Sequence, residues 1–159
     1  MNATLRPFQA EDADWLVDRH GAIYAQEDGF DSSFPVLVRQ IVDDFLASHD
    51  PAREQGWIAH CGSDRLGSIF CVTETPEVAK LRLFLLEPKA RGTGLAQHMM
   101  DKCLSFARGA GYSQMRLWTH ESHRAACRLY LRNGFRCVES QPTRSFGQDV
   151  TAQIWHRVL

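Results

Sequence analysis

The stretch "LFLLEPKARGTGLAQHMM", from Leu83 to Met100, joins an apolar, strand-like run to a helix-like pattern through a loop of small residues. A helix that begins directly after such a loop presents unpaired main-chain N–H groups. Its dipole adds about half a positive charge at the same end. Glycines let an anion approach the backbone closely, and Arg91 adds a planar cation suited to phosphate. The stretch therefore predicts a loop that binds a diphosphate.

Three phosphate-binding motifs can be compared with this loop. A P-loop needs Lys and then Ser or Thr after its last glycine, but Leu95-Ala96 follow Gly94. A dinucleotide-binding turn needs G-x-G-x-x-G, and Gln97 stands at the third glycine. The pattern R/Q-x-x-G-x-G/A is met by Arg91, Gly94 and Ala96. A glycine-rich turn without a ligand is the remaining interpretation of the loop alone.

The periodicity on either side of the loop predicts alternating strands and helices. Strands are expected at residues 4–8, 56–62, 65–74, 78–86, 114–120, 136–146 and 151–159, and helices at residues 10–26, 34–49, 94–112 and 123–135. Ser32 or Ser33 is the expected cap of the second helix. Consecutive strands with tight turns favour antiparallel pairing, whereas the strand-helix-strand unit around the loop favours one parallel pair. The fold class is therefore a mixed α/β sheet with helices packed on it.

The bulk properties are those of a single domain spanning residues 1–159. The formal net charge is -1, which gives no global attraction to nucleic acid or to an anionic membrane. Neither a signal sequence nor a membrane-length apolar run is visible. The five cysteines form no C-x-x-C pair, as expected in a reducing compartment. We expect a cytoplasmic protein.

A second motif, "HRAACRLYLRNGF", follows the next strand. The two motifs together resemble the GNAT superfamily of N-acetyltransferases, whose members pair R/Q-x-x-G-x-G/A with a helix of the form N-x-x-A-(R)-R-x-Y-x-x-x-G-F. The residues that match the second form are Ala126, Arg128, Tyr130, Gly134 and Phe135. His123 stands where Asn is usual, which is a departure from the family pattern.

The resemblance implies a fold and a co-substrate. The sheet would be mostly antiparallel, with six to seven strands, a central parallel pair splayed apart, and about four helices on both faces. Acetyl-CoA would be the acetyl donor, without a metal, and the Leu85–Leu86 backbone would polarise its carbonyl. The residues expected to bind it are Leu85, Leu86, Arg91, Gly92, Thr93, Gly94, Leu95, Ala96, His123 and Tyr130.

The resemblance also suggests catalytic roles. Tyr130 would give its proton to the leaving thiolate, which a phenol with a pKa of about 10 can do; a core aromatic is the alternative interpretation. An alkylamine must lose a proton before it attacks, and Glu27 and His120 are the candidate bases. Glu87 precedes a proline and is expected to be solvated.

A narrower resemblance concerns four segments: "RHGAIYAQEDGFDSSF", "KLRLFLLEPKARG", "RLWTHE" and "TRSFGQD". They are similar to the acetyltransferase domain found fused to MarR-type regulators. No winged-helix segment accompanies them here, so DNA binding is not expected.

The remaining patterns are weaker. The segment "HESH" supplies two histidines without a third metal ligand, and His20 and Tyr24 share one helix face that could line an acceptor pocket. The expected function is acetyl transfer to a primary amine by direct attack in a ternary complex. The amine could belong to a small molecule or a peptide, and the protein could be a monomer or a homodimer. A non-catalytic acyl-CoA-binding sensor and an interaction domain with an empty cleft are the alternatives.

Overall fold

The computed structural model describes residues 2–159, and its centre is one seven-stranded sheet in the order β1-β2-β3-β4-β5-β7-β6. All neighbouring strands are antiparallel except β4 and β5, which are parallel. The strands are β1 Thr4–Pro7, β2 Gln55–Cys61, β3 Asp64–Thr73, β4 Val78–Leu86, β5 Gln114–His120, β6 Arg136–Ser145 and β7 Gln148–Val158. The predicted mixed sheet with one parallel pair is confirmed.

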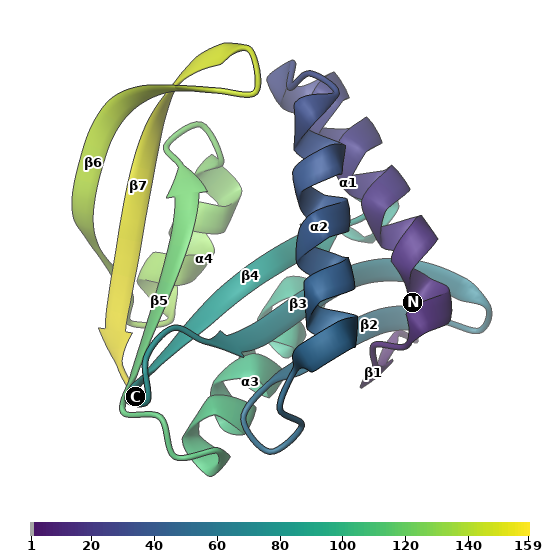
Figure 1. The fold of residues 1–159 in the computed structure, drawn as a ribbon, viewed down its shortest axis with the longest axis vertical. Coiled ribbons are helices and arrows are strands. Elements are labelled where there is room, and N and C mark those ends of the chain that lie inside the picture. The colour runs from purple at the N-terminus through teal and green to yellow at the C-terminus, as the bar shows by residue number, and fades with distance from the viewer. Residues whose placement is uncertain (1) are drawn as a thin grey trace.

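Four helices cover the two faces of the sheet, with α1 and α2 on one face and α3 and α4 on the other (Figure 1). They are α1 Ala13–Asp28, α2 Ser33–Ser48, α3 Leu95–Gly109 and α4 Arg124–Arg132, and short 3-10 turns occupy Ala10–Asp12 and Pro88–Ala90. None of the helices within residues 2–159 is long and apolar enough to cross a lipid bilayer.

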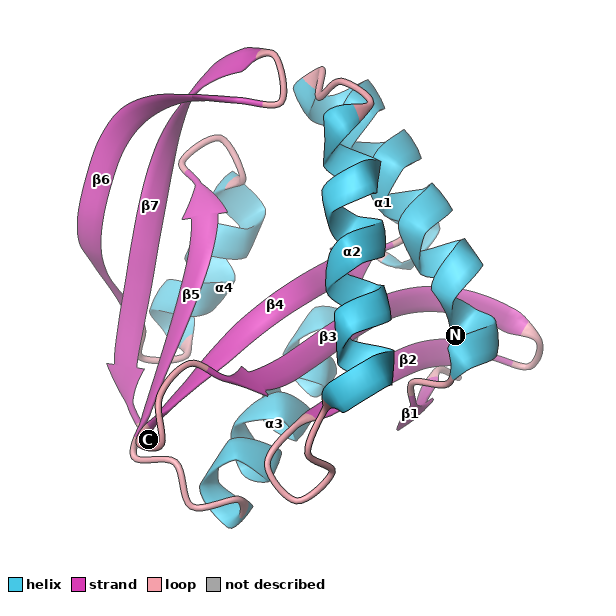
Figure 2. Cartoon of the chain, viewed as in Figure 1, coloured by secondary structure: helices cyan, strands magenta, loops and turns pink. Residues whose placement is uncertain are grey.

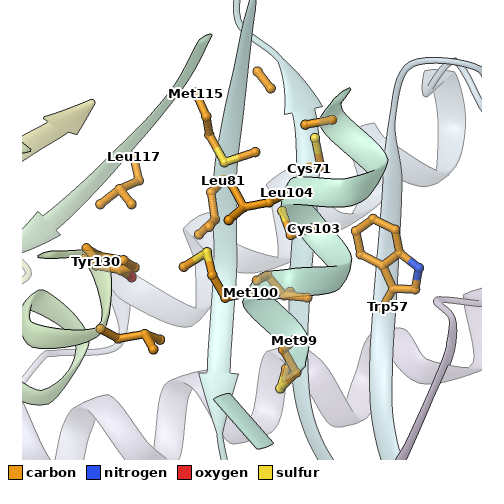
Figure 3. Packing of buried hydrophobic residues seen from close by; sticks show 14 of the residues in the cluster. Trp57, Cys71, Leu81, Met99, Met100, Cys103, Leu104, Met115, Leu117 and Tyr130 are labelled. Atoms are coloured by element: carbon orange, nitrogen blue, oxygen red, sulfur yellow. The ribbon is translucent and has the colours of Figure 1, made fainter. Parts of the chain in front are cut away.

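The larger core lies between the sheet and the pair α3 and α4. Its centre is sulfur-rich: Met99, Met100 and Cys103 of α3 pack over Cys71 and Leu81 of the strands (Figure 3). These thioether and thiol side chains are flexible or small, so they fill gaps between a helix and a twisted sheet. A second core lies beneath α1 and α2.

The turn between α1 and α2 differs from the sequence expectation. Gly29 ends α1 in the left-handed conformation, with φ 72°. Ser32 precedes α2 but makes no side-chain capping bond, so the predicted serine cap is wrong. Asp31 takes that role, because its Oδ1 accepts a hydrogen bond from the Ser33 N–H at 3.0 Å.

The parallel pair β4 and β5 is short. Val78 pairs with Gln114, and the pairing ends where Leu81 pairs with Leu117. Strand β4 itself continues to Leu86. The two strands diverge in a V toward their carboxyl ends (Figure 2). From Arg82 onward, β4 therefore has no strand partner on that side, which leaves main-chain groups free inside the sheet.

The β6–β7 hairpin closes the open end of this V. Its tip reaches the α1–α2 turn (Figure 1), where the Asp31 N–H donates to the Phe146 carbonyl at 3.0 Å. The Gln148 side-chain amide donates to the Gly29 carbonyl, also at 3.0 Å. The tip of the hairpin is thereby attached to the turn between α1 and α2.

Candidate active site

The loop between β4 and α3 carries unpaired donors, as the sequence predicted. The main-chain amides of residues 92–97 donate to no protein acceptor within residues 2–159. Gly92 and Gly94 have φ of 75° and 84°, a conformation that favours glycine. A Cβ built at either glycine would meet nothing within 4 Å, so there is open space in front of these amides. This arrangement suits a diphosphate.

Two ion pairs attach the end of β4 and its loop to α1. Arg91 contacts the Glu27 carboxylate at 2.6 Å and 3.2 Å. Arg19 contacts the Glu87 carboxylate at 2.6 Å and 2.9 Å, and Glu87 is buried. The expectation that Glu87 is solvated is therefore wrong, because this bidentate partner satisfies its charge inside the protein.

The backbone of β4 bulges next to the point where the strands part. Between the pairs Ser68–Leu85 and Phe70–Arg82, one residue of β3 faces two residues of β4. Leu83 adopts φ 52°, an uncommon conformation for a residue with a branched side chain. The bulge reorients the β4 main chain near Leu85 and Leu86, the residues that the family resemblance would place at the acetyl carbonyl.

Tyr130 of α4 faces the parted strands. Its ring lies 6.5 Å from that of Phe84 on β4 and 6.2 Å from that of Trp155 on β7, so it spans the two sides of the gap. The hydroxyl makes no hydrogen bond within residues 2–159. Burial, followed by the nearby Tyr24, raises the pKa of Tyr130 well above its usual value. The phenol therefore keeps its proton at neutral pH.

An aromatic cluster lies where the hairpin tip meets the turn between α1 and α2. We define it as Tyr24, Phe30, Phe34, His120, His123 and Phe146. The rings of Tyr24 and His123 stack at 5.4 Å, and Phe30 meets His120 edge-on at 5.4 Å. His20 lies beside Tyr24 at 6.0 Å, so the two residues that share a helix face do lie together.

Several buried polar atoms around this cluster have no hydrogen-bond partner within residues 2–159. They are His20 Nε2, Asp28 Oδ2, His120 Nδ1 and His123 Nε2. His123 Nε2 lies 3.1 Å from Asp28 Oδ1, but without hydrogen-bond geometry. Buried polar atoms are normally satisfied, so this concentration of unpaired ones indicates a site for a polar ligand.

Burial lowers the pKa of two imidazoles in this region, His120 and His20. Burial, and next His123, lowers the pKa of His120, while Asp28 partly opposes the shift. Burial also lowers the pKa of His20 to about 4. His120 is thus unprotonated at neutral pH and can accept a proton.

The structure brings most of the predicted residues together and separates one of them. His120 and His123 lie side by side in the aromatic cluster and Tyr130 lies near Tyr24 of that cluster, whereas Glu27 is engaged by Arg91. His123 faces Tyr24 and Asp28. Asp28 was missed by sequence reasoning, although a signal was present: it is an acid in the last turn of α1, where the helix dipole disfavours negative charge.

The chain has no group of three or more metal-ligating side chains placed to hold an ion within residues 2–159. The segment "HESH" brings His120 and His123 to 5.4 Å between ring centres, but they contact aromatic rings and Asp28 instead.

Comparison with known proteins places this architecture in a family. N-acetyltransferase 8F1 of Rattus norvegicus is 32% identical over 104 residues, which are 62% of this chain and 47% of that protein. The chain thus spans about half the length of this curated relative. An acetyltransferase structure from Streptococcus agalactiae matches with a TM-score of 0.82 at 19% identity, over 99% of this chain and 98% of that one.

The yncA acetyltransferase structure from Salmonella typhimurium, described with its cofactor acetyl-CoA, matches with a TM-score of 0.78 at 13% identity, over 100% of this chain and 95% of that one. The profile of the Acetyltransferase (GNAT) family matches residues 10–135, which include the amide-lined loop, the parted strands and all of α4. With that match over most of its length, the chain belongs to the acetyltransferase (GNAT) family.

Proposed function

We propose that the protein is an N-acetyltransferase that moves an acetyl group from acetyl-CoA to a primary amine. The observation that carries the proposal is the opening of β4 and β5 beyond Leu81 and Leu117, next to the unpaired amides of residues 92–97. Those amides would hold the diphosphate of the coenzyme, and Arg91 would add a cation. The free β4 backbone near Leu85 and Leu86 would then face the thioester.

The chemistry requires one acid and one base. The amine nitrogen forms a bond to the carbonyl carbon, and the bond from that carbon to sulfur breaks. We assign Tyr130 as the donor of a proton to the departing thiolate, because its hydroxyl is protonated and makes no other hydrogen bond. A main-chain N–H near Leu85 would stabilise the oxyanion. The product is an amide and free coenzyme A.

We assign His120 as the base that takes the proton of the amine. Its imidazole is kept neutral by burial, and its Nδ1 is unpaired. Glu27, the other candidate, already forms an ion pair with Arg91, which suits a role in placing that arginine at the loop. Leu95, Ala96 and His123 remain proposed coenzyme contacts, as do Gly92, Thr93 and Gly94.

Two finer assignments stay predictions. One is the resemblance to the acetyltransferase domain fused to MarR-type regulators, and the other is a cytoplasmic monomer or homodimer without nucleic-acid partners. Neither bears on the chemistry of the cleft.

The test combines coenzyme binding with release of free thiol. Titration calorimetry with coenzyme A should give binding, and a panel of primary amines with acetyl-CoA should release thiol. His120→Asn should lower kcat by about 100-fold or more, whereas Glu27→Gln should mainly change coenzyme affinity. Binding without turnover on any amine would favour an acyl-CoA sensor, and the absence of binding would reject both functions.

A further inference from the structure

Three positively charged side chains gather on the face of the sheet opposite α3. Ala79 and Leu81 point into the core under α3, so Lys80 and Arg82 point to the opposite face, because side chains alternate along a strand. Lys80 is opposite Arg116 in the parallel register, which places Arg116 on the same face. Three cations therefore border the start of the V.

One acid compensates this charge only in part. Glu74 Oε2 lies 3.8 Å from the Arg116 guanidinium. Arg82 has no ion pair or hydrogen bond within residues 2–159, although it is half-buried. A guanidinium has five N–H donors, and removing it from water without an acceptor is costly. An unpaired, half-buried arginine beside a reaction cleft indicates an anion supplied by a ligand.

A cavity lies beside two of these cations, Lys80 and Arg116, and Arg82 is the next β4 residue on the same face of the sheet, next to the cavity wall but not part of it. The volume of the cavity is about 330 Å³, within the range of small-molecule sites, and its wall consists of Glu74, Lys80, Arg116, Leu117, Trp118 and Ile154. Trp118 is 59% exposed, which is unusual for so large an apolar side chain. Its indole and Ile154 supply an apolar wall next to the positive charge.

The cations lie close to the proposed reaction centre. Arg82 is the first β4 residue beyond the last paired one, and Leu85 follows three positions later. At about 3.3 Å per residue the two main-chain positions are at most about 10 Å apart, because the bulge between them shortens the strand, and the long arginine side chain can shorten this span further. A ligand held at Arg82 with its other end at the gap is therefore a small molecule.

We propose that the acceptor is a small primary amine that also carries a carboxylate, which Arg82 binds with support from Lys80 and Arg116. The inference rests on the proposed function and names its substrate class. A carboxylate matches the planar fork of a guanidinium. Polyamines are disfavoured, because they would bring further positive charge to this face.

The test uses matched acceptors that differ only at the anionic group: amino acids, their methyl esters, the decarboxylated amines and the aminoalkyl phosphonates. We expect kcat/KM to be at least tenfold higher for the carboxylates than for the esters or the amines. Preference for the phosphonates would reassign the anion and contradict the carboxylate. Equal rates across the set would overturn the inference while leaving N-acetyl transfer in place.

Arg82→Met removes the charge and keeps an apolar stem. It should raise KM for carboxylate acceptors by tenfold to 100-fold and leave KM for the esters unchanged, and Lys80→Met should act in the same direction. Arg136→Met, at an exposed arginine at the start of β6, is the control for charge loss. It should change neither the KM for carboxylate acceptors nor the KM for esters. An equal effect of Arg82→Met on both acceptor classes would contradict the proposal.

Calorimetry on protein saturated with coenzyme A separates this inference from catalysis. The carboxylate acceptors should bind there even if turnover is absent, and Arg82→Met should weaken that binding. If no carboxylate binds, the inference is wrong whatever the enzyme does with other amines.

Discussion

The buried side chain of Ser68 donates a hydrogen bond to the main-chain carbonyl of Leu83 at 2.7 Å. Leu83 is the positive-φ residue of the β4 bulge, so this bond supports the strand at the point where it leaves β5. A single hydroxyl on β3 thus helps to hold the backbone proposed to polarise the acetyl carbonyl.

Ser68→Ala should weaken both the bulge and the reaction. We expect a loss of about 1–3 kcal/mol in the free energy of unfolding, because the Leu83 carbonyl loses its partner. We also expect kcat/KM to fall by tenfold to 100-fold, because the β4 backbone shifts. Ser48→Ala is the matched control, since its hydroxyl donates to the Asp44 carbonyl at 3.0 Å on an exposed helix end. Unchanged kcat/KM in a folded Ser68→Ala protein would disprove the role of the bulge.

Gly94→Ala should weaken coenzyme A binding by at least tenfold. The φ of 84° costs a residue with a Cβ about 1–2 kcal/mol, and the added methyl group enters the space in front of the loop amides. Gly62→Ala is the control. Gly62 also has a positive φ, 59°, and open space around a built Cβ, but it lies in the turn between β2 and β3. Calorimetry should find normal affinity for the Gly62 variant. Equal affinity in the two variants would reject the loop as the diphosphate site.

Tyr130→Phe should lower kcat by about 100-fold to 10,000-fold while coenzyme affinity stays within about twofold, because only the proton donor is removed. Tyr112→Phe is the control: that buried phenol donates to the Arg53 carbonyl at 2.8 Å, so its loss should cost about 1 kcal/mol of stability and no turnover. Steady-state kinetics and urea unfolding measure both effects. A Tyr130 variant with wild-type kcat would exclude this residue as the acid.

His20 should make the protein less stable as the pH falls from about 6.5 to about 4. Burial lowers the pKa of His20 to about 4 in the folded state, so the unfolded chain binds the proton first and unfolding is favoured throughout that window. The full shift is worth about 3 kcal/mol at 1.36 kcal/mol per pKa unit. Urea unfolding at several pH values measures it.

His20→Leu should flatten this pH dependence. His49→Leu is the matched variant for removing an imidazole, because His49 Nδ1 contacts the Phe45 carbonyl at 2.8 Å, as His20 Nδ1 contacts the Leu16 carbonyl at 2.8 Å, but at a half-buried position. An unchanged slope in the His20 variant would place the titrating group elsewhere.

The fold was predictable where local pattern decided it. The apolar alternation of Val78–Leu86 and Gln114–His120 predicted both strands with their observed bounds, and the loop between β4 and α3 followed from its glycines. The predicted serine cap of α2 is wrong because Asp31, just before Ser32, accepts the hydrogen bond from the Ser33 N–H instead.

The candidate site was less predictable, because its contacts join distant parts of the chain. The pairing of Arg19 with Glu87 spans 68 positions and is invisible to local rules, as is the approach of Asp28 to His123. In the sequence, Arg82 is only one charged residue that alternates with apolar ones in the strand Val78–Leu86. Local rules do not show that β4 and β5 separate at Arg82, or that its half-buried guanidinium has no partner within residues 2–159.

A crystal structure with coenzyme A tests the central claim most directly. We predict that the diphosphate will accept hydrogen bonds from the amides of residues 92–97, and that the sulfur will lie between β4 and β5 within reach of the Tyr130 hydroxyl. Coenzyme bound elsewhere, or strands β4 and β5 paired to their ends around an empty loop, would contradict the account.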